Sequence, residues 1–204
     1  MNRKLGWWFS VCITLASASA SAEQATPQND LIDSFFQHGR YEAGVASGAM
    51  FSPIGADKGR PILNYTLSGL QFGWMLTDAN QSYWLPGNLE VLGEAIGGTV
   101  FKGRGSYLAG GTLWLRYNFV EPNWRLVPYV QAGAGAEGTD FDQRLVGEKF
   151  NFNLNVGVGA RYFVRQNLSI NVECLYQHLS NAKLSHTDLG VNAVGPMIGL
   201  SYFF

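Results

Sequence analysis

Apolar and polar residues alternate along most of this chain from residue 41 to its end. Between Phe150 and Tyr162, every second residue is apolar, whereas the residues between them are Asn, Gly or Arg. Such alternation predicts β-strands, because successive side chains of a strand point to opposite faces of the sheet. Strands are expected at residues 41–52, 64–77, 86–97, 109–121, 125–136, 150–164, 167–180 and 193–204.

Two architectures can bury one face of such strands in the protein interior. A soluble β-sandwich buries the apolar face, whereas a transmembrane barrel buries the polar face. Charges of both signs lie on the polar faces, as a small barrel interior requires, because lipid offers no water to buried polar groups. These charges are Glu90, Glu94, Arg116, Arg161 and Glu173. Aromatic residues gather near the strand ends, as in the girdles of outer-membrane barrels, and the last alternating strand ends in Phe204. We therefore predict an all-β fold, an eight-stranded antiparallel transmembrane β-barrel of the bacterial outer membrane, with a sandwich as the alternative.

The connections are expected to differ in length between the two ends of this barrel. Long connections follow the first, third, fifth and seventh strands, whereas residues 121–124 and 164–166 form tight turns. Outer-membrane barrels place short turns in the periplasm and long loops outside the cell. Both termini are therefore expected in the periplasm. The long connections, near positions 56, 103, 143 and 186, are expected outside the cell.

The first 22 residues have the layout of a secretory signal peptide. Arg3 and Lys4 precede an apolar run, and small residues lead to a cleavage site that we expect after Ala22. A lipoprotein signal at Cys12 is the weaker alternative, because Val11 stands where such a signal needs a small residue.

Removal of the signal peptide changes the charge and the cysteine content. It takes two of the 14 basic residues and none of the 15 acidic ones, so the formal net charge becomes 12 − 15 = −3. This charge gives no reason to expect a nucleic-acid partner. Cys174 remains as the single cysteine, which excludes an intramolecular disulfide. Residues 23–40 are expected to form a polar periplasmic lead with one short amphipathic turn, and residues 41–204 to form the barrel.

Motifs for other kinds of chemistry are absent or stand in the wrong context. Residues 133–138 satisfy the G-x-G-x-x-G pattern of dinucleotide-binding proteins, but no helix follows them, so we interpret them as small residues where barrel side chains crowd. His38, His178 and His186 are the three histidines, and their spacing is not that of a zinc site. A G-x-S-x-G nucleophile elbow is also absent. We expect neither a metal nor another cofactor.

His178 and Ser180 lie two residues apart at the end of the seventh predicted strand. Side chains at this spacing share one face, with their Cα atoms roughly 6–7 Å apart, which suits a hydrogen bond between imidazole and hydroxyl. The pair continues the apolar face that includes Tyr176, so it is expected to face lipid. Such a position indicates a function for the pair, although an interfacial histidine and a loop-proximal serine can also fall together by chance.

The segment around this pair resembles a known family. Residues 178–182, His-Leu-Ser-Asn-Ala, are followed by Gly-Val-Asn at residues 190–192, before the last strand. This combination resembles the signature of the PagL-type lipid A 3-O-deacylases, and the strand layout is similar over nearly the whole mature chain. The resemblance implies hydrolysis of the 3-O-linked acyl chain of lipid A at the outer leaflet, with Ser180 as nucleophile and His178 as general base. Asn181 is a candidate for stabilising the oxyanion, by its side chain or its backbone N–H.

Asn192 departs from the family pattern, which has a glutamate two residues after the loop glycine. An Asn oxygen can accept a hydrogen bond from the imidazole N–H and fix its tautomer, but it lacks the charge that stabilises an imidazolium. Asp188, in the same loop, is the other candidate for orienting His178.

Three functions are weighed on this basis. The first is a serine esterase that remodels lipopolysaccharide, the second is a non-catalytic barrel whose long loops bind ligands or partners, and the third is another acyl-lipid hydrolase or acyltransferase of the same membrane. The expected partners are lipid A and outer-membrane lipid, and the sequence leaves a homodimer open. Glu173 has the opposite parity to His178, so we expect it to point inside and to pair with Arg116 or Arg161.

Overall fold

The computed structural model describes residues 30–52, 62–80, 85–142, 146–184 and 189–204. The expected signal peptide and the positions near 56, 143 and 186 lie outside these ranges. Among the described residues, no helix is long and apolar enough to cross a membrane.

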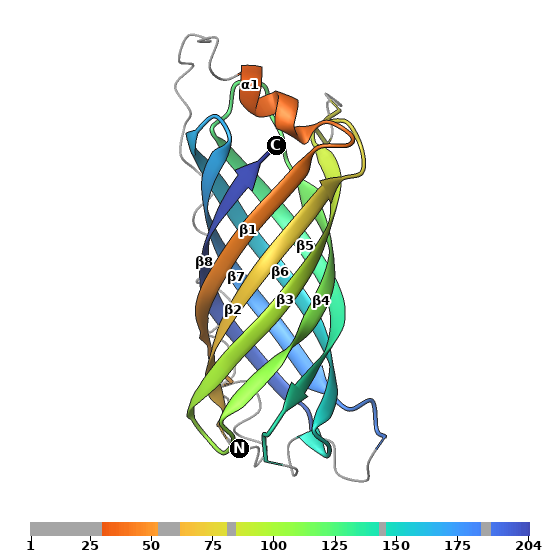
Figure 1. The fold of residues 1–204 in the computed structure, drawn as a ribbon, viewed down its shortest axis with the longest axis vertical. Helices are drawn as coiled ribbons and strands as arrows, with labels where there is room; N and C mark the ends of the chain where they lie inside the picture. Colours follow the sequence, from red (N-terminus) through yellow and green to blue (C-terminus); the bar gives the residue numbers. More distant parts are fainter. Residues whose placement is uncertain (1–29, 53–61, 81–84, 143–145, 185–188) are drawn as a thin grey trace, which may run out of the picture.

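Eight antiparallel strands form a closed barrel, as the alternation predicts (Figure 1). Each strand pairs with its neighbours in sequence, and β1 also pairs with β8, which closes the sheet. The strands are β1 Tyr41–Met50, β2 Asn64–Met75, β3 Asn88–Lys102, β4 Tyr107–Asn118, β5 Leu126–Thr139, β6 Phe150–Arg165, β7 Leu168–Ser180 and β8 Val191–Phe203. The glycine-rich residues 133–138 lie within β5, which continues three residues beyond the predicted end of this strand at residue 136.

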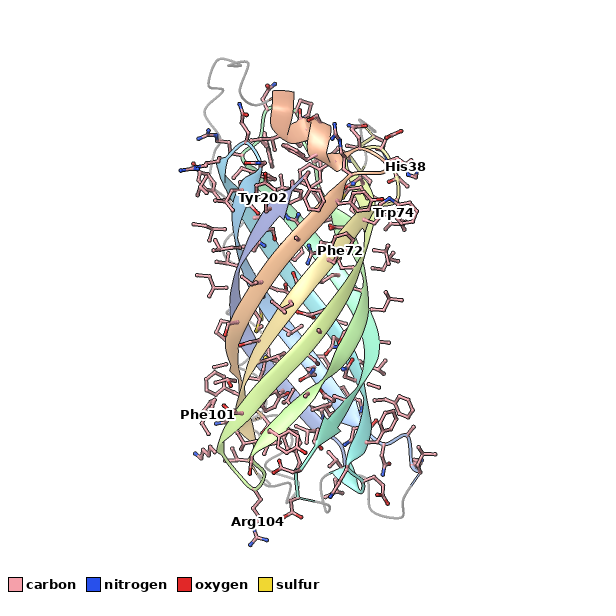
Figure 2. The ribbon with its side chains drawn as sticks, viewed as in Figure 1. His38, Phe72, Trp74, Phe101, Arg104 and Tyr202 are labelled. Carbon is pink, nitrogen blue, oxygen red and sulfur yellow. The ribbon has the colours of Figure 1, made fainter. Side chains whose placement is uncertain are left out.

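The outer surface of the barrel is apolar over its middle and aromatic at both ends. Figure 2 shows Phe72, Trp74 and Tyr202 at the end that carries α1 (Asp30–Asp33), and Phe101 at the opposite end. These four side chains are exposed. An apolar surface between two aromatic bands matches the lipid-facing wall of an outer-membrane barrel.

The interior contains a neutral cluster of two arginines and two glutamates. Arg161 Nη1 lies 2.7 Å from Glu42 Oε2, and Arg116 Nη1 lies 3.4 Å from Glu42 Oε1. Glu90 Oε2 lies 3.6 Å from Arg116 Nη1 and 3.7 Å from Arg161 Nη2. All four side chains are buried. Their charges balance, which meets the requirement that charges in a low-dielectric interior be paired.

Glu173 points into the barrel as predicted, but its predicted ion pair with an arginine is wrong. Its carboxylate accepts hydrogen bonds from the Tyr129 hydroxyl at 2.8 Å and from Gln131 Nε2 at 2.9 and 3.1 Å. Both arginines form their ion pairs with Glu42 and Glu90 instead. The register of the other strands places these two glutamates beside the arginines. Pairing across the barrel depends on register and not on alternation within one strand.

The connection between β3 and β4 is shorter than predicted. Residues 98–102 were expected to lie at the start of a long loop, but β3 continues to Lys102 and the turn covers only residues 103–106. Gly98 is required inside the strand, because a Cβ there would collide with the Thr66 carbonyl oxygen. Asp140 Oδ1 holds the turn by accepting from the backbone N–H groups of Ser106 and Tyr107 at 2.6 and 2.9 Å, which lowers the pKa of Asp140.

The described part of the lead before β1 closes one end of the barrel. α1 and the short 3-10 helix η1 (Ser34–Phe36) form the predicted amphipathic turn. Ile32 and Phe36 are buried against an apolar cluster that includes Phe163 and Phe203. Because Arg161 also lies over the ring of Phe36, this cap shields the ionic cluster from water at the α1 end.

Candidate active site

The site lies on the outer face of β7 and β8, at the end of the barrel opposite α1. In the antiparallel register, His178 is directly opposite Asn192, and Ser180 is the last residue of β7. His178, Ser180 and Asn192 are half-buried and share the lipid-facing side of their strands, as predicted for His178 and Ser180. The neighbouring strand β6 places Phe152 opposite Ser180 and Leu154 opposite His178, and both of these apolar side chains are exposed.

Asn192 contacts the imidazole of His178 by a short hydrogen bond. His178 Nδ1 lies 2.6 Å from Asn192 Oδ1. A carboxamide oxygen can only accept, so Nδ1 carries the proton in this arrangement. The other ring nitrogen, Nε2, is then unprotonated and able to accept a proton, which is the state that a general base requires.

Ser180 shares an open pocket of about 330 Å³ with His178. The pocket is also lined by Ala182, Lys183, Leu189 and Gly190. The hydrogen bond between Ser180 and His178 that the spacing predicts is not formed among the described residues. Catalytic hydrogen bonds are often long before substrate binds and shorten in the reacting complex.

A strained turn follows the serine. Ala182 and Lys183 have φ angles of 55° and 63°, in the left-handed region that non-glycine residues rarely adopt. The turn is closed by a 3.1 Å hydrogen bond from the Leu184 N–H to the Asn181 carbonyl oxygen. Strained backbone next to a reactive side chain is a feature of functional sites.

Gly190 lies against the edge of the His178 imidazole. Its φ is +65°, and a Cβ built on it would lie 3.1 Å from His178 Cε1. A larger residue would therefore strain the backbone and press on the ring. The motif that contains Gly190 is visible in the sequence, but the contact between the glycine and the imidazole is not.

The sequence also named Asn181 and Asp188 as supporting residues, and the structure describes only Asn181. Asn181 is fully buried and is not among the residues that line the pocket. Asp188 lies outside the described residues. The structure adds Tyr176, whose hydroxyl donates to Asn192 Oδ1 at 3.0 Å. Its alternation with His178 and Ser180 on one face was a signal for this contact.

This arrangement can support nucleophilic catalysis by a serine hydroxyl. It combines a hydroxyl, an imidazole on the same strand face and an acceptor that fixes the imidazole tautomer, which are the parts of an activated serine. These three side chains face the membrane, so an amphipathic lipid can reach them from the side.

Comparisons with known proteins agree with this arrangement. Residues 44–201 match the family described as "Lipid A 3-O-deacylase (PagL)". No curated protein sequence matches the chain.

The chain also resembles solved barrels at low sequence identity. The outer membrane enzyme PagL is 19% identical, with a TM-score of 0.58 over 78% of this chain and 97% of the other. The N-terminal β-barrel domain of Pseudomonas aeruginosa OprF is 18% identical, with a TM-score of 0.53 over 82% and 98% of the two chains. Neisserial surface protein A is 15% identical, with a TM-score of 0.54 over 81% and 97%. These likenesses show the fold, and the family match covers most of the barrel. The chain is an outer-membrane β-barrel hydrolase that belongs to the PagL family of lipid A 3-O-deacylases.

Proposed function

We propose that Ser180 is the nucleophile of this deacylase, that His178 is its general base and that Asn192 orients His178. The observation that carries the proposal is the 2.6 Å contact between His178 Nδ1 and Asn192 Oδ1. It leaves Nε2 as a proton acceptor in the same pocket as Ser180. An acidic residue is therefore not required to select the tautomer.

The reaction follows the serine-esterase scheme. Nε2 of His178 takes the hydroxyl proton as Ser180 Oγ attacks the ester carbonyl at position 3 of the glucosamine. The bond from the acyl carbon to the sugar oxygen breaks, and the imidazolium returns its proton to that oxygen. Water then attacks the acyl-enzyme, Nε2 takes a proton from it, and the fatty acid leaves as Ser180 regains its hydrogen.

The oxyanion of each tetrahedral intermediate requires hydrogen-bond donors. Because the Asn181 side chain is fully buried, we assign this role to backbone N–H groups of residues 181–183. Ala182 and Lys183 line the pocket beside Ser180, which supports the assignment. Backbone donors held in a strained turn are already oriented before the reaction begins.

The substrate enters from the membrane and not from the barrel interior. Lipid A lies in the outer leaflet with its esters just below the headgroup, and the site faces outward at one rim of the barrel. We therefore assign the rim that carries Ser180 to the cell exterior and the α1 end to the periplasm. Labelling of single cysteines in intact cells tests this: modification at position 123 but not at 103 would reverse the orientation.

Mass spectrometry of lipid A from cells that express the protein tests the chemistry. The wild type is expected to release the 3-O-linked acyl chain, and Ser180→Ala is expected to lower the rate by about 10³-fold or more, because it removes the nucleophile. Ser68→Ala is the matched control, since Ser68 is an exposed serine of β2 that bonds to Ser47. Full activity of Ser180→Ala would exclude the serine mechanism. Unmodified lipid A with the folded wild type would favour a non-catalytic barrel.

A further inference from the structure

Asn192 Oδ1 accepts two hydrogen bonds from the same strand. His178 Nδ1 lies at 2.6 Å and the Tyr176 hydroxyl at 3.0 Å. We propose that Tyr176 is a positioning residue, which holds the Asn192 carboxamide with its oxygen toward His178 and so keeps the imidazole in the tautomer that can act as a base. This inference rests on the proposed roles of Ser180 and His178.

A carboxamide needs such a partner, whereas a carboxylate does not. Both oxygens of a carboxylate accept hydrogen bonds, so either can face the imidazole. A carboxamide has one accepting end and one donating end. If Asn192 rotated by half a turn, its NH₂ group would face Nδ1 of His178. The proton of the ring would then move to Nε2, which would become a donor and could no longer take the proton of Ser180.

The Tyr176 hydroxyl favours the productive orientation because Asn192 Oδ1 already accepts its proton. A rotated carboxamide would turn its NH₂ group, a second donor, toward this hydroxyl. Among the described residues, Asn192 Oδ1 is the acceptor for this hydroxyl. Rotation of the carboxamide would remove that acceptor and leave the Tyr176 proton without a partner. The cost of an unmade hydrogen bond therefore opposes the rotation.

The position of Tyr176 is fixed by its strand neighbours. It lies opposite Val156 of β6 and opposite Val194 of β8, two residues before His178. Its hydroxyl reaches along β8 to Asn192, which is itself the register partner of His178. The three side chains therefore form one chain of contacts, Tyr176 to Asn192 to His178, on the lipid-facing side.

Kinetics of Tyr176→Phe in two backgrounds tests the proposal. In the wild-type background, Tyr176→Phe is expected to lower kcat about tenfold, with KM little changed, because the hydroxyl acts through Asn192 and does not contact substrate. In an Asn192→Asp background, the same change is expected to alter kcat less than about twofold, because a carboxylate needs no orientation. Tyr162→Phe is the control, since Tyr162 is an exposed tyrosine of β6 whose hydroxyl does not bond to Asn192.

A second measurement reads the tautomer without using activity. ¹⁵N NMR of the imidazoles in detergent micelles, with His178→Ala to identify the signal, is expected to show Nδ1–H in the wild type. Tyr176→Phe is expected to increase the Nε2–H form in the Asn192 background but not with Asp at position 192. The NMR comparison stands even if Asn192→Asp is inactive.

The outcomes separate this inference from the proposed function. An unchanged tautomer in Tyr176→Phe, or an equal loss of kcat in both backgrounds, overturns the positioning role while Ser180→Ala still tests the mechanism. Full activity of Ser180→Ala overturns the mechanism, and the tautomer measurement still decides whether Tyr176 orients Asn192. Heat-modified mobility on gels confirms that each variant forms the barrel.

Discussion

Two polar networks lie on opposite sides of the same barrel wall, and they handle charge differently. Inside, Glu42, Glu90, Arg116 and Arg161 form a buried cluster in which two negative charges face two positive ones. Outside, Tyr176, Asn192 and His178 form a chain of groups that carry no formal charge when the imidazole is neutral.

The difference follows from what each network must do. The interior cluster is sealed by protein, so full charges are tolerated because they pair with one another. The outer network borders lipid and must leave one nitrogen available for a proton. An Asn in place of a carboxylate avoids a charge at the hydrocarbon boundary, at the cost of weaker stabilisation of the imidazolium. The interior network is therefore expected to govern stability, and the outer one to govern activity.

The largest loss of stability is expected from Arg161→Met, in the interior network. It leaves Glu42 and Glu90 with one arginine instead of two, and the loss of a buried partner typically costs about 3–5 kcal/mol of unfolding free energy. Urea unfolding in micelles measures the loss, while the folded fraction should keep its specific activity. Arg104→Met is the control, because the pair of Arg104 with Asp142 is 3.7 Å long and the Arg104 side chain is 77% exposed. Equal stability of the two variants would contradict the structural role of the cluster.

Changes at Asn192 should affect activity and leave stability nearly intact. Asn192→Ala removes the acceptor of His178 Nδ1 and is expected to lower turnover about 10- to 100-fold. Asn192→Glu is expected to keep or raise it, and Asp188→Asn to change it little. Lipid A deacylation by the three variants in one detergent system provides the measurement. Loss with Asp188→Asn, together with mild effects at position 192, would make Asp188 the orienting residue. Wild-type rates for all three would mean that neither residue orients His178.

Gly190→Ala should separate backbone strain from pressure on the imidazole. A left-handed alanine costs about 1 kcal/mol, and the new Cβ would lie 3.1 Å from His178 Cε1. Activity is therefore expected to fall several-fold beyond the loss explained by unfolding. Gly39→Ala is a matched control, since Gly39 has φ +84° but nothing within 4 Å of its Cβ position. If both variants keep the same activity per folded molecule, the contact with the imidazole is unimportant.

The smallest effect is expected from Glu173→Gln, on the inner side of β7. The change weakens charge-assisted hydrogen bonds from Tyr129 and Gln131, and about 1 kcal/mol of stability should be lost with no change in specific activity. Glu137→Gln serves as the comparison, because neither carboxylate oxygen of Glu137 has a hydrogen-bond partner among the described residues. The Glu137→Gln change should therefore not lower the stability of the barrel. A folded but inactive Glu173→Gln protein would contradict the assignment of strand faces.

The sequence by itself determined the strands, their faces and the location of the proposed catalytic pair. Alternation has a period of two residues, so it assigns His178 and Ser180 to the outer face and Glu173 to the inner face without knowledge of any other strand. The match of residues 178–182 and 190–192 to a family signature then indicated the chemistry.

Only the tertiary structure decided which side chains meet across strands. Register depends on the hydrogen-bond ladders and on the closure of β1 against β8, which involve residues far apart in the sequence. It directs Glu42 to two arginines, directs Glu173 to Tyr129 and Gln131, and brings the Tyr176 hydroxyl to Asn192. The β3–β4 turn was misplaced for the same reason. Gly98, which was expected in the connection, lies within β3, where the neighbouring strand leaves no room for a side chain.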